Sequence, residues 1–271
     1  MKQRMSWFSI YVKGNFHVSF SALSLSLLSM QWLNISPPFV VYFFLFISTF
    51  LGYSFLKYYS VRDKLLTSSS FFNTFLLLSL LVGCVALVIG LFSLRLPSIV
   101  VAAIATVITL FYAKGSPVAF SRENGFVKIV LVGLVWALMC VSFPVAHFGI
   151  DMLLSKAVVH LFFAVLLLVL ALMVPFEIRD LASDQLHWPT LAQYLGTTRI
   201  KAVGFACLLG ALVLFGKVTM GGLSTYTAMC TLGALVSLAI WKSHKNQSQW
   251  FASFWVEAIP IAAFAVNYLF K

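Results

Sequence analysis

Charged residues are scarce in this sequence of 271 residues: Asp, Glu, Lys and Arg make up 9% of it, whereas 62% is hydrophobic. Soluble domains are about 25% charged and about 45–50% apolar, so these values exclude a water-soluble globular protein. A membrane helix needs about 20 mostly apolar residues, which gives the chain room for about eight to ten spans but not for a separate soluble domain. We therefore expect a single domain, residues 1–271, within the membrane.

Motifs of the common soluble enzyme classes are also missing. The four cysteines stand singly in apolar runs, without the paired spacing of a metal or redox site. Serine-nucleophile elbows, Walker-type phosphate loops, dinucleotide fingerprints and zinc signatures are absent. A net charge of +11 would suggest nucleic acid in a soluble protein, but here the cations fall mainly in short loops between apolar runs. In such loops they set membrane orientation, so we expect the lipid bilayer and no nucleic acid as a partner.

Nine apolar runs predict nine transmembrane helices, at residues 16–33, 39–58, 71–94, 97–113, 128–145, 156–175, 201–215, 223–241 and 251–270. When alternate loops are assigned to opposite sides, with the N-terminus inside, 14 of the 18 Lys and Arg residues fall on the inner side. Lys and Arg gather in cytoplasmic loops, so this split predicts a cytoplasmic N-terminus and an outside C-terminus. We expect an integral, multi-pass protein of the bacterial inner (plasma) membrane.

Acidic residues number only seven, and three of them, Glu177, Asp180 and Asp184, lie within eight residues of one another. They follow the sixth predicted span without a strong helix breaker, and at about 100° per residue they share one helix face within about 60°. Such carboxylates repel unless a cation lies between them. Because Mg²⁺ is typically held by one or two carboxylates and by phosphate oxygens, the cluster predicts a magnesium-diphosphate site. The alternative is a solvated acidic helix end, neutralised by Arg179.

The acidic segment resembles the second acidic motif of the UbiA-type intramembrane prenyltransferases. In that family an Asn-Asp-x-x-Asp-x-x-x-Asp helix end is followed by Lys-Thr-Leu-Pro and by Leu-Gly. The corresponding residues here are Glu177-Ile-Arg-Asp180-Leu-Ala-Ser-Asp184, then Thr190-Leu191 and Tyr194-Leu195-Gly196. The nine-span layout agrees with the family, and residues 128–136 resemble the start of its fifth helix.

The resemblance implies an all-α, UbiA-like bundle of about nine transmembrane helices with a cavity that opens sideways to lipid. It implies an enzyme that transfers a polyprenyl group from its diphosphate to an aromatic or other lipid-soluble acceptor, as in quinone biosynthesis. It further implies that Asp180 and Asp184 are catalytic, and that Glu177, Asp180 and Asp184 bind Mg²⁺, which is the cofactor and acts on the substrate diphosphate. In the family, two acidic motifs at the cytoplasmic ends of the second and sixth helices hold this site.

The first acidic motif departs from the family pattern. Tyr53 and Lys57 stand where an Asn and an Asp would fall, and the nearby acid, Asp63, is out of phase. Because lysine binds phosphate as a point charge, Lys57, Arg62 or Lys64 can supply the positive charge that a second metal ion would give. We therefore include these three cations among the diphosphate-binding candidates.

Other residues on the predicted inner side are candidates for the same site. Lys114, Arg122 and Arg179 are further diphosphate-binding candidates, with the alternative that such cations only set orientation. Tyr53 and Tyr112, near the inner ends of spans, are candidates to line the cavity and to shield an allylic cation. Aromatic residues are also expected at membrane interfaces without any such role.

Three classes of function stay open from the sequence. The first is the prenyltransferase. The second, which the altered first motif favours, is a catalytically degenerate UbiA-like protein that binds a prenyl lipid or acts as a membrane scaffold. A transporter is the third, although no internal repeat of the kind common in transporters is present. Glu257, the one acid in the body of a predicted span, has no role in any of these hypotheses.

Overall fold

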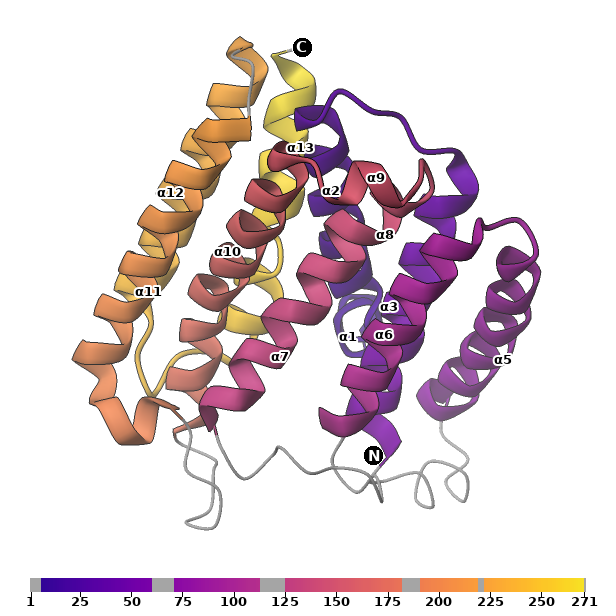
Figure 1. Cartoon of the computed structure of the whole chain (residues 1–271). Helices are drawn as coiled ribbons and strands as arrows, with labels where there is room; N and C mark the ends of the chain where they lie inside the picture. The colour runs from indigo at the N-terminus through magenta and orange to yellow at the C-terminus, as the bar shows by residue number, and fades with distance from the viewer. Residues whose placement is uncertain (1–5, 60–70, 113–124, 182–190, 219–221, 271) are drawn as a thin grey trace.

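The computed structural model describes residues 6–59, 71–112, 125–181, 191–218 and 222–270. Over these ranges the chain forms a bundle of helices without a strand (Figure 1). The helices are α1 (Trp7–Lys13), α2 (Phe16–Trp32), α3 (Phe39–Tyr58), α5 (Phe71–Leu91), α6 (Leu96–Tyr112), α7 (Gly125–Ala137), α8 (Phe143–Ala146), α9 (Ile150–Leu153), α10 (Lys156–Asp180), α11 (Leu191–Val218), α12 (Leu223–Lys242) and α13 (Ile259–Leu269). Two π-helical segments, η2 (Leu138–Ser142) and η3 (Phe251–Val256), lie after α7 and before α13.

The nine predicted apolar runs all coincide with helical segments of the described chain. Seven of these segments are long and apolar enough to cross a membrane: Phe39–Tyr58, Phe71–Leu91, Phe126–Ala146, Lys156–Asp180, Leu191–Val218, Leu223–Lys242 and Phe251–Leu269. The other two segments, α2 and α6, have 17 residues each. The all-α membrane fold is thus confirmed, while the number of spans and the side of each terminus stay predictions.

Helix α2 has 17 residues and is less apolar than a typical membrane helix because it is rich in serine. Ser19, Ser21, Ser26 and Ser29 are all buried. Small side chains let neighbouring helices approach closely in a membrane, and α2 packs against both α3 and α13. Its serines therefore fit an interior helix of the bundle, which need not present an apolar surface to lipid.

Helix α10 lies at the centre of the fold, and α5 lies at its edge (Figure 1). α10 packs against α7, α11 and α12, and Leu161, Leu168 and Ile178 are among its fully buried side chains. α5 instead exposes apolar side chains such as Leu81 and Ile89. Such an apolar outer face is unfavourable in water and is expected where the surrounding solvent is lipid.

Helix α10 continues through Pro175 to Asp180, as expected for the acidic segment. Helix α11, in contrast, begins at Leu191 rather than at the predicted residue 201. Polar residues before position 201 indicated a loop, but they occupy helical turns that extend beyond the apolar part of α11. The chain bends at Gly196, whose φ of 74° and ψ of 163° are accessible to glycine and strained for other residues.

The helix ends that flank the predicted inner loops lie together at one end of the bundle (Figure 1). They are the end of α3, the beginnings of α5 and α7, and the end of α10. We call this the α3/α10 end. The last turn of α13 lies at the opposite end, where Asn267 donates a hydrogen bond to Gln31 at the end of α2.

Candidate functional site

A cavity of about 420 Å³ lies near the α3/α10 end, between α1, α2, α3, α10 and η3. Three cationic side chains line it, Lys13, Lys57 and Arg179, together with one carboxylate, Glu257. Tyr53 of α3 lies one helical turn before Lys57 and also faces the cavity. The cavity therefore joins candidate residues from the second and sixth predicted spans, as the two-motif resemblance implies.

Lys57 is fixed in the cavity by the turn between α1 and α2. Its Nζ donates to the backbone oxygen of Lys13 at 3.0 Å and to Oδ1 of Asn15 at 3.4 Å. Asn15 has a left-handed φ of 64°, which asparagine tolerates better than most residues, and its Nδ2 donates to Oγ of Ser54 at 3.0 Å. The Lys57 ammonium also lies 5.5 Å from the centre of the Tyr58 ring. Its partners among the described residues are thus neutral oxygens and an aromatic ring, so its positive charge is available to an anion in the cavity.

Arg179 links the end of α10 to η3. Its Nε and NH2 both lie 2.8 Å from Oδ1 of Asp180, and its NH1 donates to Oγ of Ser253 at 3.1 Å. The guanidinium carbon also lies 5.2 Å from the centre of the Phe176 ring. Arg179 is therefore held by contacts with Asp180, Ser253 and Phe176. It presents a fixed, planar cation at the cavity wall.

Glu177 points away from the cavity and into the protein. Its side chain is fully buried, and Oε1 accepts from Lys128 Nζ of α7 at 3.1 Å. Oε2 accepts from the backbone N–H of Leu191, the first residue of α11, at 3.2 Å. The carboxylate thus joins α7, α10 and α11, and binding a metal ion would require it to give up these contacts.

The predicted metal ligands do not form a cluster in the part of the chain that the structure describes. No group of three or more His, Cys, Asp or Glu side chains that could hold a metal ion occurs there. Asp180 contacts Arg179, Glu177 contacts Lys128, and Asp184 lies outside the described residues. The resemblance assigns three carboxylates to Mg²⁺, and the structure describes two of them, Glu177 and Asp180. Of these two, Asp180 is partly exposed and lies next to the cavity residue Arg179.

The remaining candidates are only partly placed. Tyr53 accepts a hydrogen bond from Nε1 of Trp136 at 2.8 Å, which ties α3 to α7 beside the cavity. Tyr112 is the last residue of α6. Four predicted diphosphate-binding residues lie outside the described residues: Arg62, Lys64, Lys114 and Arg122.

Glu257 and Lys13 are cavity residues that the sequence did not assign to a site. Glu257 follows the π-helical segment η3, and π-helical turns are frequent at functional sites. It lines the cavity together with Lys57 and Arg179. Burial, and then the negative charge of Glu257, raise the pKa of the Tyr11 hydroxyl above its ordinary value. An isolated acid in a predicted span was the available signal, because such groups need a partner or a function.

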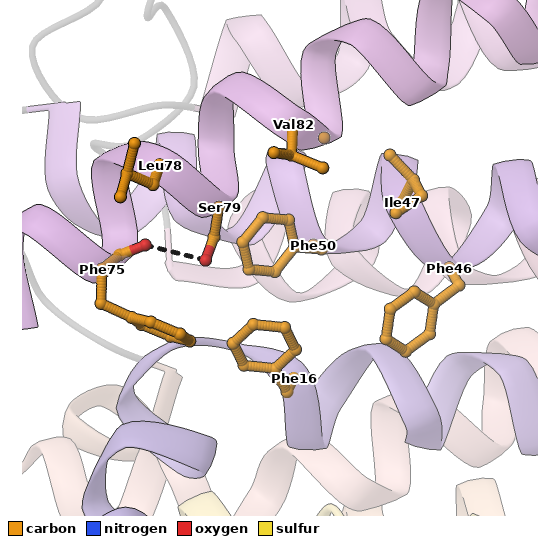
Figure 2. A pocket seen from close by; sticks show the side chains of 9 residues that line it. Phe16, Phe46, Ile47, Phe50, Phe75, Leu78, Ser79 and Val82 are labelled. Carbon is orange, nitrogen blue, oxygen red and sulfur yellow. Dashed lines mark hydrogen bonds between the residues drawn. The ribbon is translucent and has the colours of Figure 1, made fainter.

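A second, apolar groove of about 310 Å³ lies between α2, α3 and α5. Figure 2 shows the rings of Phe16, Phe50 and Phe75 around it, with Ser79 bonded to the backbone of α5. Phe50 is one helical turn before Tyr53, so one side of α3 runs from this groove to the cationic cavity. The two hollows together offer a charged surface and an apolar one along the same helix.

No protein-family model matches the sequence, and no curated protein matches it. The structure is similar to that of a UbiA homologue from Archaeoglobus fulgidus, which was solved bound to GPP and Mg²⁺. The TM-score is 0.64 at 11% sequence identity, and the similarity covers 97% of this chain and 99% of that one. At this identity the likeness concerns the backbone fold alone, and it extends over nearly the whole of both chains. This protein therefore has a UbiA-like helical fold.

Proposed function

We propose that this protein binds a polyprenyl diphosphate in the cavity at the α3/α10 end and transfers the prenyl group to an aromatic or other lipid-soluble acceptor. The observation that carries the proposal is the convergence of Tyr53, Lys57 and Arg179 on one cavity of a UbiA-like bundle. These residues come from the two helices on which the resemblance implies the diphosphate site. The UbiA homologue of similar fold binds GPP, which is a prenyl diphosphate.

The side chains of the cavity match the charge that develops in such a reaction. Transfer breaks the allylic carbon–oxygen bond, and the electron pair leaves with the diphosphate as the acceptor forms its bond to carbon. The acceptor then loses a proton, which the released diphosphate or water takes up. Fixed cations that face the leaving oxygens stabilise this charge without reorganisation. Lys57 and Arg179 are suited to that role, and Tyr53 lies beside them.

The proposal includes a Mg²⁺ ion bound by the acidic residues at and after the end of α10. Asp180 and Asp184 would hold the ion together with diphosphate oxygens, and the ion would supply further positive charge at the leaving group. In this proposal Glu177 has a structural role and does not bind the ion, because Lys128 and the backbone N–H of Leu191 already bond to its two oxygens. It fixes the direction in which the end of α10 leaves the bundle.

The apolar groove of Figure 2 is suited to the isoprenoid chain. Its lining is almost wholly aromatic and aliphatic, and it follows the same side of α3 as Tyr53 and Lys57. Burial of a chain there would contribute about 25 cal/mol for each Å² of apolar surface removed from solvent. In a membrane that contribution is smaller, because the chain leaves lipid rather than water.

The test is binding and transfer with geranyl diphosphate, measured with and without Mg²⁺ on the purified protein. Saturating ligand should raise the thermal midpoint, because a ligand selective for the folded state stabilises it by about 2.7 kcal/mol at 100 times its Kd. Asp180→Ala should weaken the Mg²⁺-dependent part of geranyl diphosphate binding. Lys201→Gln, at a half-buried cation that is bonded to the backbone oxygen of Trp241, should not. An unchanged Kd in Asp180→Ala would remove Asp180 from the site.

A second function is favoured by one specific observation. Lys57 stands where the resemblance implies an acid, and the chain holds it in place by bonds to Lys13 and Asn15. A catalytically degenerate protein that binds a prenyl lipid, or that serves as a membrane scaffold, would fit this substitution. Binding of geranyl diphosphate without transfer to any of a panel of lipid-soluble aromatic acceptors would favour the binding protein, and no thermal shift at saturating ligand would favour the scaffold.

A further inference from the structure

Glu257 is the unexplained charge of the cavity. It lines the same space as Lys13, Lys57 and Arg179, and it is the carboxylate among the residues of that lining. Within the described ranges no hydrogen bond or ion pair reaches its carboxylate, although Asp180 and Glu177 each contact a cation directly. Lys57 and Arg179 line the same cavity, so their positive charges act on it across that space.

An ionised carboxylate within a membrane bundle requires compensating charge nearby. The cations around Glu257 have other bonds: Lys57 is bonded to neutral oxygens, and Arg179 is shared between Asp180 and Ser253. Glu257 therefore balances the charge of the cavity from a distance and closes no ion pair. A negatively charged ligand that enters has to overcome repulsion from Glu257 as it approaches these cations.

We propose that Glu257 is the built-in counter-ion of a diphosphate site formed by Lys57 and Arg179. It neutralises part of the cavity's positive charge while no ligand is bound and opposes the diphosphate once it binds. Glu257 thereby weakens the affinity for diphosphate and eases its release. This inference rests on the proposed function for the prenyl ligand, but it also applies to inorganic diphosphate alone.

The position of Glu257 in the chain fits this role. The π-helical segment η3 ends directly before it, and the backbone oxygen of Phe254 in that segment lies 2.9 Å from Nε2 of His17. Ser253, in the same segment, accepts from Arg179. Contacts from α2 and α10 thus hold η3 in place directly before Glu257, which lines the cavity.

The experiment measures the Kd of inorganic diphosphate and of geranyl diphosphate in mildly alkaline buffer, which favours the ionised form of the carboxylate. Glu257→Gln should lower the Kd of both ligands by about tenfold or more, because the repelling charge is lost and the size of the side chain is kept. Glu257→Asp, which keeps the charge, should stay near the wild-type Kd. Lys57→Gln should weaken both ligands by about tenfold or more, and Lys201→Gln, bonded to a backbone oxygen like Lys57 but outside the cavity, should change neither.

Each outcome decides between the hypotheses. Tighter binding of inorganic diphosphate by Glu257→Gln, with no binding of geranyl diphosphate by any variant, supports the counter-ion and refutes the proposed prenyl function. Unchanged or weaker binding of both ligands in Glu257→Gln overturns the counter-ion even if prenyl transfer occurs. Absence of diphosphate binding in wild type and in Glu257→Gln alike also overturns it. The thermal midpoint of each unliganded variant shows that it is folded.

Discussion

The buried contact between Lys128 and Glu177 gives the sharpest test of how the acidic end of α10 is built. Replacing Lys128 with Met keeps an apolar stem of similar length but removes the ammonium, so Glu177 loses the cation 3.1 Å from its Oε1. The carboxylate then keeps the backbone N–H of Leu191 at 3.2 Å. Because the Glu177 side chain has no exposed surface, water cannot take the place of the lysine without a change in packing.

The expected loss of stability follows from this burial. Removing one partner of a buried ion pair costs about 3–5 kcal/mol, because the other charge stays buried without compensation. Lys128 is itself 18% exposed and the Leu191 N–H remains, so the lower end of that range, about 3 kcal/mol, is expected. At roughly 2–4 °C for each kcal/mol, the midpoint of thermal unfolding should fall by about 6–12 °C.

The assay is thermal unfolding of Lys128→Met, Glu177→Gln and the double variant in the same detergent. Glu177→Gln keeps an oxygen for the Leu191 N–H, and the double variant should recover most of the loss of Lys128→Met because no buried charge is left unpaired. A midpoint for Lys128→Met within about 1 °C of wild type would refute the reasoning. If Glu177 instead serves as a metal ligand, Glu177→Gln would abolish the Mg²⁺ dependence of geranyl diphosphate binding, which a purely structural role leaves intact.

Three further predictions concern packing around the site. A Cβ at Gly204 would lie 2.8 Å from Cγ2 of Val174, so Gly204→Ala should lower the unfolding free energy by about 1–3 kcal/mol in the same thermal assay. A Cβ at Gly216 in the same helix would meet open space, so the control Gly216→Ala should raise the unfolding free energy by about 0.5–1 kcal/mol. Tyr53→Phe removes the acceptor of the Trp136 N–H and should cost about 1–3 kcal/mol by the same measurement; an unchanged midpoint would contradict the bond. Ser79→Phe fills the apolar groove and should weaken geranyl diphosphate roughly tenfold, about 1.4 kcal/mol, with inorganic diphosphate unaffected in the same titration; equal effects on both ligands would argue against a chain in the groove.

The helical fold was accessible from the sequence because hydropathy alone marks where a chain can lie in lipid. Each predicted apolar run coincides with a helical segment, and the run predicted at residues 39–58 has the same bounds as α3. The boundary of α11 was wrong by ten residues, because its first turns carry polar residues that hydropathy assigns to a loop. The first of these turns is tied to α10, because the backbone N–H of Leu191 donates to Glu177, and no local pattern reveals such a bond.

The candidate site was predictable only in outline. Lys57 was chosen from the motif resemblance, and Tyr53 and Arg179 from their place on the predicted inner side; all three line one cavity in the structure. Lys13 and Glu257 were missed as site residues, because they come from the first and last helical regions of the chain. Their contribution depends on α1 and η3 packing beside α3 and α10, and no spacing within either segment specifies that arrangement.

The sequence by itself determined the solvent of this protein, the positions of its helices and the segment of α10 that carries the acids, because these follow from hydropathy and from helical periodicity along one chain segment. Only the tertiary structure decided what faces each of those acids. Lys128, 49 residues away, takes Glu177 into the interior, while Arg179 holds Asp180 beside the cavity. Two carboxylates on nearly the same helix face thus have different surroundings, since the charge nearest to each is set by how α7, α11 and η3 pack around α10.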